Sequence, residues 1–252
     1  MIIVMGKNAS QESIEGVIGF IRNKGLKEHV SRGEERTIIG AVGDERVFRP
    51  NELERLPDVE RVVRVLNDWK IISREADEED GRIVVRGVIF GGAKRLDITA
   101  DTDRAEEADA VFVDPFYLPA RPYEKVDEQR ENLRVRAIVR EISDLQKTGK
   151  PVIVRIRDVR QIDKALSAGA DILYLGGSMM TNRTLLDEVG RLNTPVVLCK
   201  DKHHRVDDWL VAAEHIALRG NSHIMLGEAG TLSFEPEHAY RLDVDAIVRV
   251  RK

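Results

Sequence analysis

The sequence is poor in the features that identify several common classes of protein. It holds a single cysteine, Cys199, in 252 residues. One cysteine excludes an internal disulfide, and it excludes zinc fingers and iron–sulfur clusters that need several thiolates. The apolar run at the start, MIIVM, is far too short to span a bilayer, and no basic segment precedes it. We therefore expect a cytoplasmic protein without a signal peptide or a membrane partner.

A surplus of one charge is also missing. The chain carries 40 basic and 44 acidic residues, which gives a formal net charge of -4 and a pI near 5.9. Without a basic surplus there is no global field to attract phosphate backbones. The composition thus predicts no nucleic-acid partner, and the length leaves room for one barrel or two smaller domains.

Residues 1–76 alternate short strands with helices. A strand is expected over 1–6, followed by a helix that Asn8 or Ser10 can cap and Gly25 can end. The apolar face of this helix holds Ile14, Val17, Ile18 and Ile21. The pattern continues with two strands around a turn, a short helix and a strand, at 26–44, 51–56 and 59–66. This βαββαβ order predicts a ferredoxin-like domain.

The pattern changes after the acidic tract EADEEDG, which is typical of a solvated linker. We assign 77–95 to this linker and to a hairpin over 82–90. From 96 to 252, strand signals recur at LDITA, AVFVD, PVIVRI, DILYLGG, PVVLCK and HIMLGE. Amphipathic helical patterns lie between several of them, which predicts a parallel α/β sheet. About six strand units predict an incomplete (β/α) TIM-like barrel, because a standard barrel closes with eight.

Several polar clusters are candidate sites. The stretch VVLCKDKHH at 196–204 joins a thiol to cations and imidazoles, which suits a nucleophile or a metal ligand. No orienting partner can be identified, so a loop with solvated charges is preferred. Asp97, Asp101 and Asp103 lack the glycine and distal glutamate of a calcium loop, and helix capping is preferred. The glycines of 176–178 permit phosphate binding, but a plain turn is preferred.

Three segments strongly resemble one protein family. HVSRGEERTIIGAVGD at 29–44, VERVVRVL at 59–66 and KIISRE at 70–75 are similar to the ferredoxin-like regulatory domain that precedes the barrel in type Iβ 3-deoxy-arabino-heptulosonate 7-phosphate (DAHP) synthases. A weaker resemblance extends over 194–235. Enzymes of this family condense phosphoenolpyruvate with erythrose 4-phosphate on a metal-bearing barrel, the first step toward aromatic amino acids. The resemblance therefore implies an α/β chain made of a ferredoxin-like domain and a barrel.

The chain departs from the family at its metal site. Counting without gaps places Thr102 where the family's Gly-Pro-Cys-Ser motif has its metal-binding cysteine, and a hydroxyl is a poor replacement for a thiolate. The segment that supplies the family's histidine ligand would follow Lys252. The family also has a full helix where 101–109 leave room for hardly more than two turns. We expect no metal and no cofactor.

The substrate-binding cations of the family are also largely replaced. Its Lys-Pro-Arg-Thr-Ser-Pro loop corresponds to 116–124, where Arg121 alone could supply a cation. Its Lys-Arg-Gly motif falls on 199–201, so that Lys200 could replace only the arginine. Its Glu-Arg-Gly motif falls on 228–230, which keeps Glu228 and loses the arginine. Two phosphorylated substrates need several cations. Lys200, Glu228 and Arg121 remain as candidate catalytic residues.

The first strand pair carries the candidate effector site. In the family this surface forms an aromatic amino-acid site between paired domains. The resemblance implies that His29 and Ser31 supply hydrogen bonds, and that Gly33, Ile39 and Gly40 shape the backbone. From composition alone, the preferred interpretation of these residues is a hairpin whose polar side chains have no specific role.

Two functions stay open. The first is a non-catalytic relative of DAHP synthase that senses tyrosine or phenylalanine and acts as a regulatory or interaction subunit, by self-association or by joining an intact DAHP synthase. The second is an aldol-type condensing enzyme with an altered site. A truncated gene product is a further alternative.

Overall fold

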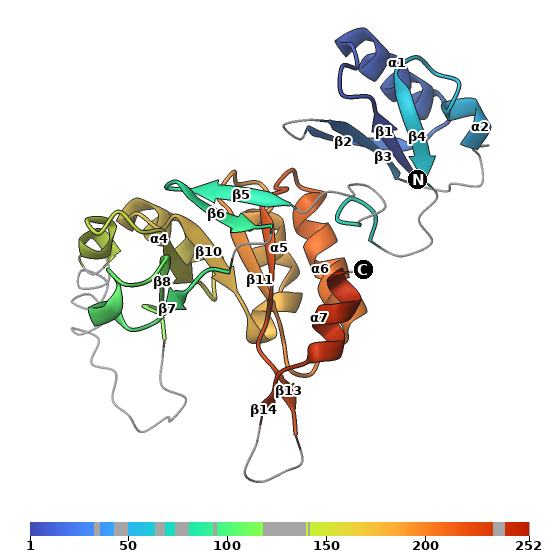
Figure 1. Cartoon of the computed structure of the whole chain (residues 1–252). Coiled ribbons are helices and arrows are strands. Elements are labelled where there is room, and N and C mark those ends of the chain that lie inside the picture. Colours follow the sequence, from blue (N-terminus) through green and yellow to red (C-terminus); the bar gives the residue numbers. More distant parts are fainter. Residues whose placement is uncertain are drawn as a thin grey trace.

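The structure is a computed structural model of the whole chain. It describes residues 1–32, 36–42, 50–63, 69–73, 81–92, 95–117, 140, 142–233 and 240–251. Within them, a small antiparallel sheet near the N-terminus is followed by a hairpin and by a larger parallel sheet flanked by helices (Figure 1). No helix in these ranges is both long and apolar enough to cross a membrane.

The N-terminal sheet has the predicted ferredoxin-like arrangement. Its strands are antiparallel in the order β2-β3-β1-β4. The elements are β1 (Ile2–Met5), α1 (Gln11–Asn23), β2 (Lys27–Arg32), β3 (Thr37–Val42), α2 (Pro50–Leu53) and β4 (Val59–Val63). Helix α1 begins where the Ser10 hydroxyl accepts the Ser13 N–H at 3.1 Å, and it is followed by Gly25 at φ +79. The capping signals in the sequence thus set both ends of α1.

The predicted hairpin lies between the two sheets in the sequence. It consists of β5 (Arg82–Val85) and β6 (Val88–Gly91), paired antiparallel. Arg86 and Gly87 join them with φ values of 48 and 79, as a two-residue turn with left-handed positions requires. Val85 and Phe90 of the hairpin pack against Ala110, Ile153 and Ile172 of the parallel sheet.

The larger sheet confirms the six predicted strand units. Its parallel strands follow the order β12-β11-β10-β9-β8-β7 and form a curled half-barrel. They are β7 (Ile98–Thr99), β8 (Ala110–Val113), β9 (Val152–Arg155), β10 (Ile172–Leu175), β11 (Val196–Lys200) and β12 (Ile224–Glu228). Because each strand is parallel to its neighbours, the carboxyl ends of all six lie at one edge of the sheet.

Short helices and a ribbon connect these strands. The helices are η2 (Thr102–Arg104), η3 (Val159–Gln161), α4 (Ile162–Ala168), η4 (Gly177–Thr181), α5 (Arg183–Val189), α6 (Val206–Ala217) and α7 (Val244–Arg251). The ribbon pairs β13 (Thr231–Leu232) with β14 (Tyr240–Arg241). The last described segment of the chain is the helix α7.

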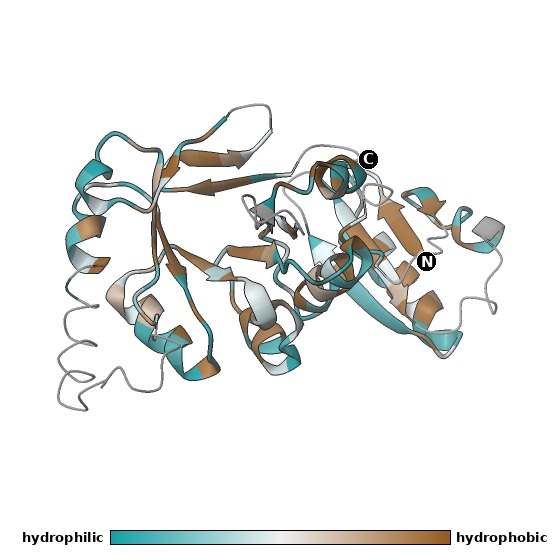
Figure 2. Cartoon of the chain, turned by 90° about the horizontal axis from the view of Figure 1, so that it is seen from below, coloured by the Kyte–Doolittle hydropathy of each residue, from teal (hydrophilic) through white to brown (hydrophobic). Residues whose placement is uncertain are grey.

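The parallel sheet has two distinct faces. On the outer face, side chains such as Leu173 and Leu198 pack with the helices in the main core. The inner face is the one that the β5–β6 hairpin covers, and it carries Phe112, Tyr174 and Val197. Figure 2 shows apolar residues concentrated on most strands and hydrophilic residues gathered on helices and loops. Because side chains alternate along a strand, each residue's parity assigns its face.

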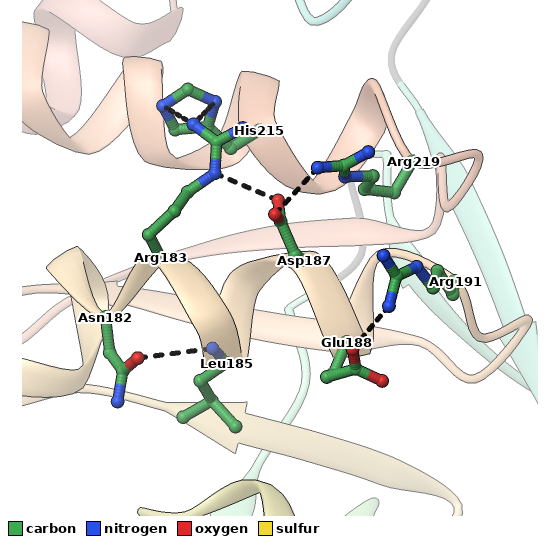
Figure 3. A network of polar contacts seen from close by, with 8 residues as sticks. All are labelled: Asn182, Arg183, Leu185, Asp187, Glu188, Arg191, His215 and Arg219. Atoms are coloured by element: carbon green, nitrogen blue, oxygen red, sulfur yellow. Dashed lines mark hydrogen bonds and ion pairs between the residues drawn. The ribbon is translucent and has the colours of Figure 1, made fainter.

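Helices α5 and α6 are joined by surface charges (Figure 3). The Asp187 carboxylate accepts hydrogen bonds from Arg219 Nη2 at 2.7 Å and from Arg183 Nε at 2.9 Å. Arg183 Nη1 also lies 2.6 Å from Nδ1 of His215. The Arg219 hydrogen bond is the main reason that the pKa of Asp187 falls to about 2.

Candidate functional site: the carboxyl edge of the parallel sheet

The carboxyl edge of a parallel sheet is where ligands bind in α/β folds. Here β8 is followed by Asp114, β9 ends at Arg155, and β11 and β12 end at Lys200 and Glu228. The pairing of Lys200 with Glu228 gives these two residues the same face of the sheet. Cys199 is paired with Gly227 and lies on the opposite, inner face. The edge thus holds two separate groups of polar side chains.

The outer group contains two of the predicted catalytic residues. Lys200 is only 2% exposed, and its Nζ lies 3.2 Å from Asp243 Oδ2, just before α7. Glu228 Oε2 accepts the Asp243 N–H at 3.3 Å, and Oε1 accepts the Gly230 N–H at 2.5 Å. The Ala246 N–H, and then Lys200, hold the pKa of Asp243 below its usual range. Lys200 and Glu228 therefore anchor the start of α7 on the helical side of the sheet.

The inner group contains the only cysteine and a tyrosine. Cys199 is buried, and its thiol and the Tyr174 hydroxyl are close enough for each to act on the pKa of the other. Burial raises the pKa of both groups, so neither is ionised near neutral pH. Because the thiolate is the reactive form, this environment disfavours a nucleophilic role for Cys199.

Two arginines and one carboxylate complete the inner group. Both Nη atoms of Arg157 donate to the two carboxylate oxygens of Asp114. Arg155 Nη1 lies 3.6 Å from Asp114 Oδ2, and its guanidinium lies over the Tyr174 ring at 5.6 Å. The sequence analysis did not select these residues. Their signal was the alternation of arginine and isoleucine after the apolar part of β9.

The segment that the resemblance places at the family's metal position does not fit a metal site. Thr102 is exposed in η2, whose N-cap is Asp101, as the preferred capping interpretation predicted. Across the described ranges, no three His, Cys, Asp or Glu side chains gather closely enough to hold a metal ion. We therefore assign no step to a metal.

The candidate effector residues are divided between two faces of the N-terminal sheet. His29 is paired with Gly40, and Ser31 with Ile38, which places His29, Ser31 and Gly40 on one face. Ile39 is fully buried on the other face, in the core beneath α1. Gly33 and Arg121 lie outside the described residues. The face that carries His29 is the one turned away from α1.

That face contacts the half-barrel. The backbone of Ala217, at the end of α6, is close enough to His29 to act on the pKa of its imidazole. A side chain at Gly40 would lie 3.9 Å from Cγ1 of Ile71, so the 69–73 segment also contacts this face. Burial lowers the pKa of His29, and the nearby Glu214 charge only partly opposes this.

Glu214 is the central polar residue of the contact, and the sequence analysis missed it. It is 5% exposed, and its two carboxylate oxygens each accept the Ile71 N–H at 3.0 Å. Oε2 also accepts the Ile72 N–H at 3.2 Å. The signal was a charged residue on an apolar helix face, four residues after Leu210 and three before Ala217.

Two family models match the chain. "DAHP synthase ferredoxin-like domain" matches residues 1–67, and "DAHP synthetase I family" matches residues 128–252. Phospho-2-dehydro-3-deoxyheptonate aldolase from Thermotoga maritima is 32% identical over 267 residues, covering 100% of this chain and 77% of that protein.

Solved structures from the same organism have a similar fold. The crystal structure of phospho-2-dehydro-3-deoxyheptonate aldolase (DAHP synthase) gives a TM-score of 0.63 at 28% identity, covering 100% of this chain and 75% of that chain. A truncated form of 3-deoxy-D-arabino-heptulosonate 7-phosphate synthase gives 0.60 at 23% identity, covering 74% of this chain and 71% of that one. The second likeness bears on the fold alone.

Proposed function

Because this chain belongs to the type I DAHP synthase family, we propose that it is a member that does not catalyse the family's condensation. In this proposal it is a cytoplasmic regulatory or interaction subunit that senses an aromatic amino acid. The observation that carries the proposal is the position of Lys200. This lysine is buried on the outer face and paired with Asp243, where it cannot meet a substrate on the inner face.

The remaining charges at the edge support the same proposal. Arg157 is matched by Asp114 through two hydrogen bonds. Glu228 is committed to the N–H groups of Gly230 and Asp243. Two phosphorylated substrates would need several preorganised donors aimed at them. Groups that already satisfy one another within the fold must first be released before they can bind substrate.

The sensing part of the proposal rests on the N-terminal region. His29, Ser31 and Gly40 share one face, and His29 contacts α6. A ligand can shift this contact only if its affinity differs between the docked and undocked states. We propose tyrosine or phenylalanine as that ligand, and self-association or binding to an intact DAHP synthase as the response.

The test of catalysis uses purified full chain with phosphoenolpyruvate, erythrose 4-phosphate and Mn²⁺. We expect no DAHP, while the Thermotoga maritima enzyme in a parallel reaction forms it. Turnover comparable to that enzyme would overturn the non-catalytic proposal. It would favour the alternative of an aldol-type condensing enzyme with an altered site, for which the relative's 32% identity across the whole chain is the supporting observation.

The test of sensing is separate. Calorimetry with tyrosine and with phenylalanine should show binding of at least one, and sedimentation at several protein concentrations should show stronger association in its presence. The double variant His29→Ala with Ser31→Ala should lose both responses. Replacing Ser143, a polar residue of the half-barrel far along the chain, with alanine provides the matched control. Absence of binding and of any change in association in the wild type would refute sensing.

A further inference from the structure

The segment 69–73 lies between the N-terminal sheet and the helices α6 and α7 (Figure 1). On the side of the sheet, Cγ1 of Ile71 lies 3.9 Å from the place that a side chain at Gly40 would take. On the other side, the Glu214 carboxylate of α6 accepts the N–H groups of Ile71 and Ile72. The segment is therefore in contact with both parts of the molecule.

The same segment packs against α7 as well as α6. Trp69 and Ile72 lie against an apolar cluster to which both helices contribute. The buried members of this cluster are Val206 and Leu210 from α6 and Ala246 from α7. The two helices thus share one apolar contact with the segment, and a displacement of the segment would open that contact to water.

Helix α7 has little else to hold it. All eight of its residues are described, and Ala246 alone is buried. An isolated helix of this length is not stable in water, so its stability must come from packing. Arg249 forms an ion pair with Asp207 of α6, but this pair is largely exposed and contributes little. The shared apolar cluster is therefore the main support of α7.

The start of α7 carries the partner of Lys200. Asp243 caps the helix, since its Oδ1 accepts the Ala246 N–H at 3.0 Å. Its Oδ2 lies 3.2 Å from Nζ of the buried Lys200. One carboxylate thus caps α7 and neutralises a charge at the carboxyl end of β11. If α7 loosens, Asp243 loses the position that this ion pair requires.

We propose that segment 69–73 is a clip that holds α7 in place, so that the Lys200–Asp243 pair weakens whenever the clip is released. The N-terminal sheet contacts one side of the clip, and the apolar cluster passes the constraint to α7 from the other. Such coupling requires only that the docked sheet and the ion pair favour the same position of the segment. It extends the proposed sensing to the half-barrel, but it depends on docking alone and needs no amino-acid ligand.

Hydrogen exchange of the full chain, without added ligand, tests the clip. Gly40→Leu introduces a branched side chain where Ile71 lies, and it should push the segment away from the N-terminal sheet from a position in β3. We expect the Ile71 and Ile72 amides to exchange about tenfold faster or more, and the amides of α7, such as that of Ile247, to accelerate with them. Amides of α5, in the same half-barrel, should stay close to wild type.

Gly16→Leu is the matched control. It introduces the same side chain at an exposed position of α1, where the added Cβ has no neighbour within 4 Å outside its own helix, and it should change none of these rates. Faster exchange at Ile71 and Ile72 in Gly40→Leu, with unchanged exchange in α7, would overturn the clip. Unchanged exchange at all of these amides would overturn it as well, because the N-terminal sheet would then not hold the segment.

The ion pair itself can be followed through the Lys200 ammonium group. Its resonance in the NMR spectrum of the wild type is assigned by its loss in Lys200→Arg. In Gly40→Leu the ammonium protons should exchange with water about threefold faster or more, because the pair opens more often. An exchange rate equal to that of the wild type would contradict the coupling between the clip and the pair.

A second variant serves if Gly40→Leu fails to fold. Ala246→Gly loosens α7 from within, because glycine lowers helix stability and the buried methyl group is lost. Coupling is reciprocal, so the Ile71 and Ile72 amides should then exchange about threefold faster or more. Exchange at these two amides that stays at the wild-type rate in Ala246→Gly would show that α7 and the segment are independent.

Discussion

Buried charges have different kinds of partner in two regions of the molecule. These regions are the carboxyl edge of the parallel sheet and the junction between α6 and the N-terminal region. At the edge, the Lys200 cation meets the Asp243 carboxylate of the same half-barrel. At the junction, the Glu214 carboxylate meets backbone N–H groups of Ile71 and Ile72, which belong to the connecting segment. The charge of Lys200 is therefore neutralised within one part of the fold. The junction depends on groups that separate if the N-terminal region undocks.

This difference indicates where the molecule can switch. Breaking the Lys200–Asp243 pair leaves a charge inside the half-barrel, which the native fold strongly resists. Undocking exposes Glu214 to water, which solvates a carboxylate well. We therefore expect the junction to open at a lower free energy than the edge.

The largest effect should come from removing the partner of Lys200. Asp243→Ala leaves a 2%-exposed ammonium without its carboxylate and also removes the hydrogen bond to the Ala246 N–H. We expect a loss of about 3 kcal/mol or more in the free energy of unfolding, measured with urea. Asp245→Ala, on the exposed first turn of α7, should cost much less. The double variant Asp243→Ala with Lys200→Met should recover most of the loss, and no recovery would contradict the pairing.

Removing the carboxylate at the junction should have a smaller and more local effect. Glu214→Ala deletes the acceptor of the Ile71 and Ile72 N–H groups. Hydrogen exchange of these two amides should speed up about tenfold or more, while exchange in β9–β11 stays close to wild type. Glu188→Ala removes an exposed carboxylate of α5 and is the matched control. Unchanged exchange at Ile71 and Ile72 in Glu214→Ala would show that this carboxylate does not hold the junction.

The junction should also weaken on acidification. The pKa of His29 is lowered by burial, so the docked state binds its proton less readily than the undocked state, whose pKa is about 6.5. The undocked state thus holds more protons in this range, and docking is favoured as pH rises. The stabilisation of the docked state by neutral His29 is complete above about pH 6.5, and it is lost as the pH falls through the lowered pKa.

Amide exchange at Ile71 and Ile72, corrected for intrinsic rates and measured from pH 7.5 down to pH 5, checks this dependence. His29→Gln should flatten the profile while keeping a polar side chain near the backbone of Ala217. Glu214 is the other titratable group that faces His29, so Glu214→Gln should be measured beside it. A profile in wild type that matches His29→Gln would exclude His29 as the group responsible.

The smallest effect concerns the surface between α5 and α6. Two arginines hold the pKa of Asp187 at about 2, below the usual value of about 3.9 for an unfolded chain. The contribution of ionised Asp187 to the stability of the fold is therefore present above about pH 4 and is lost as the pH falls toward 2. Asp187→Asn should lower the thermal unfolding midpoint slightly at pH 7 and not at pH 2. A larger loss at pH 2 than at pH 7 would show that the network of Figure 3 is not electrostatic.

Most of the fold could be predicted from local patterns. Ser10 and Gly25 mark the ends of α1, and the Arg86–Gly87 turn closes the hairpin between two apolar runs. The six strands of the half-barrel each appear as a short apolar run. Capping, turn formation and periodicity depend on residues a few positions apart, so the sequence displays them directly.

The candidate site was predicted only in part, because its residues are brought together over long distances. The sequence by itself determined which charged groups are available and the single thiol. Only the tertiary structure decided that Lys200 and Glu228 face the helices while Arg155 faces the interior. The alternation of side chains along a strand shows which residues share a face. Which of the two faces is the inner one depends on where the hairpin and the helices pack. The contact of Glu214 with Ile71 spans 143 positions, and no local pattern encodes a pairing at that separation.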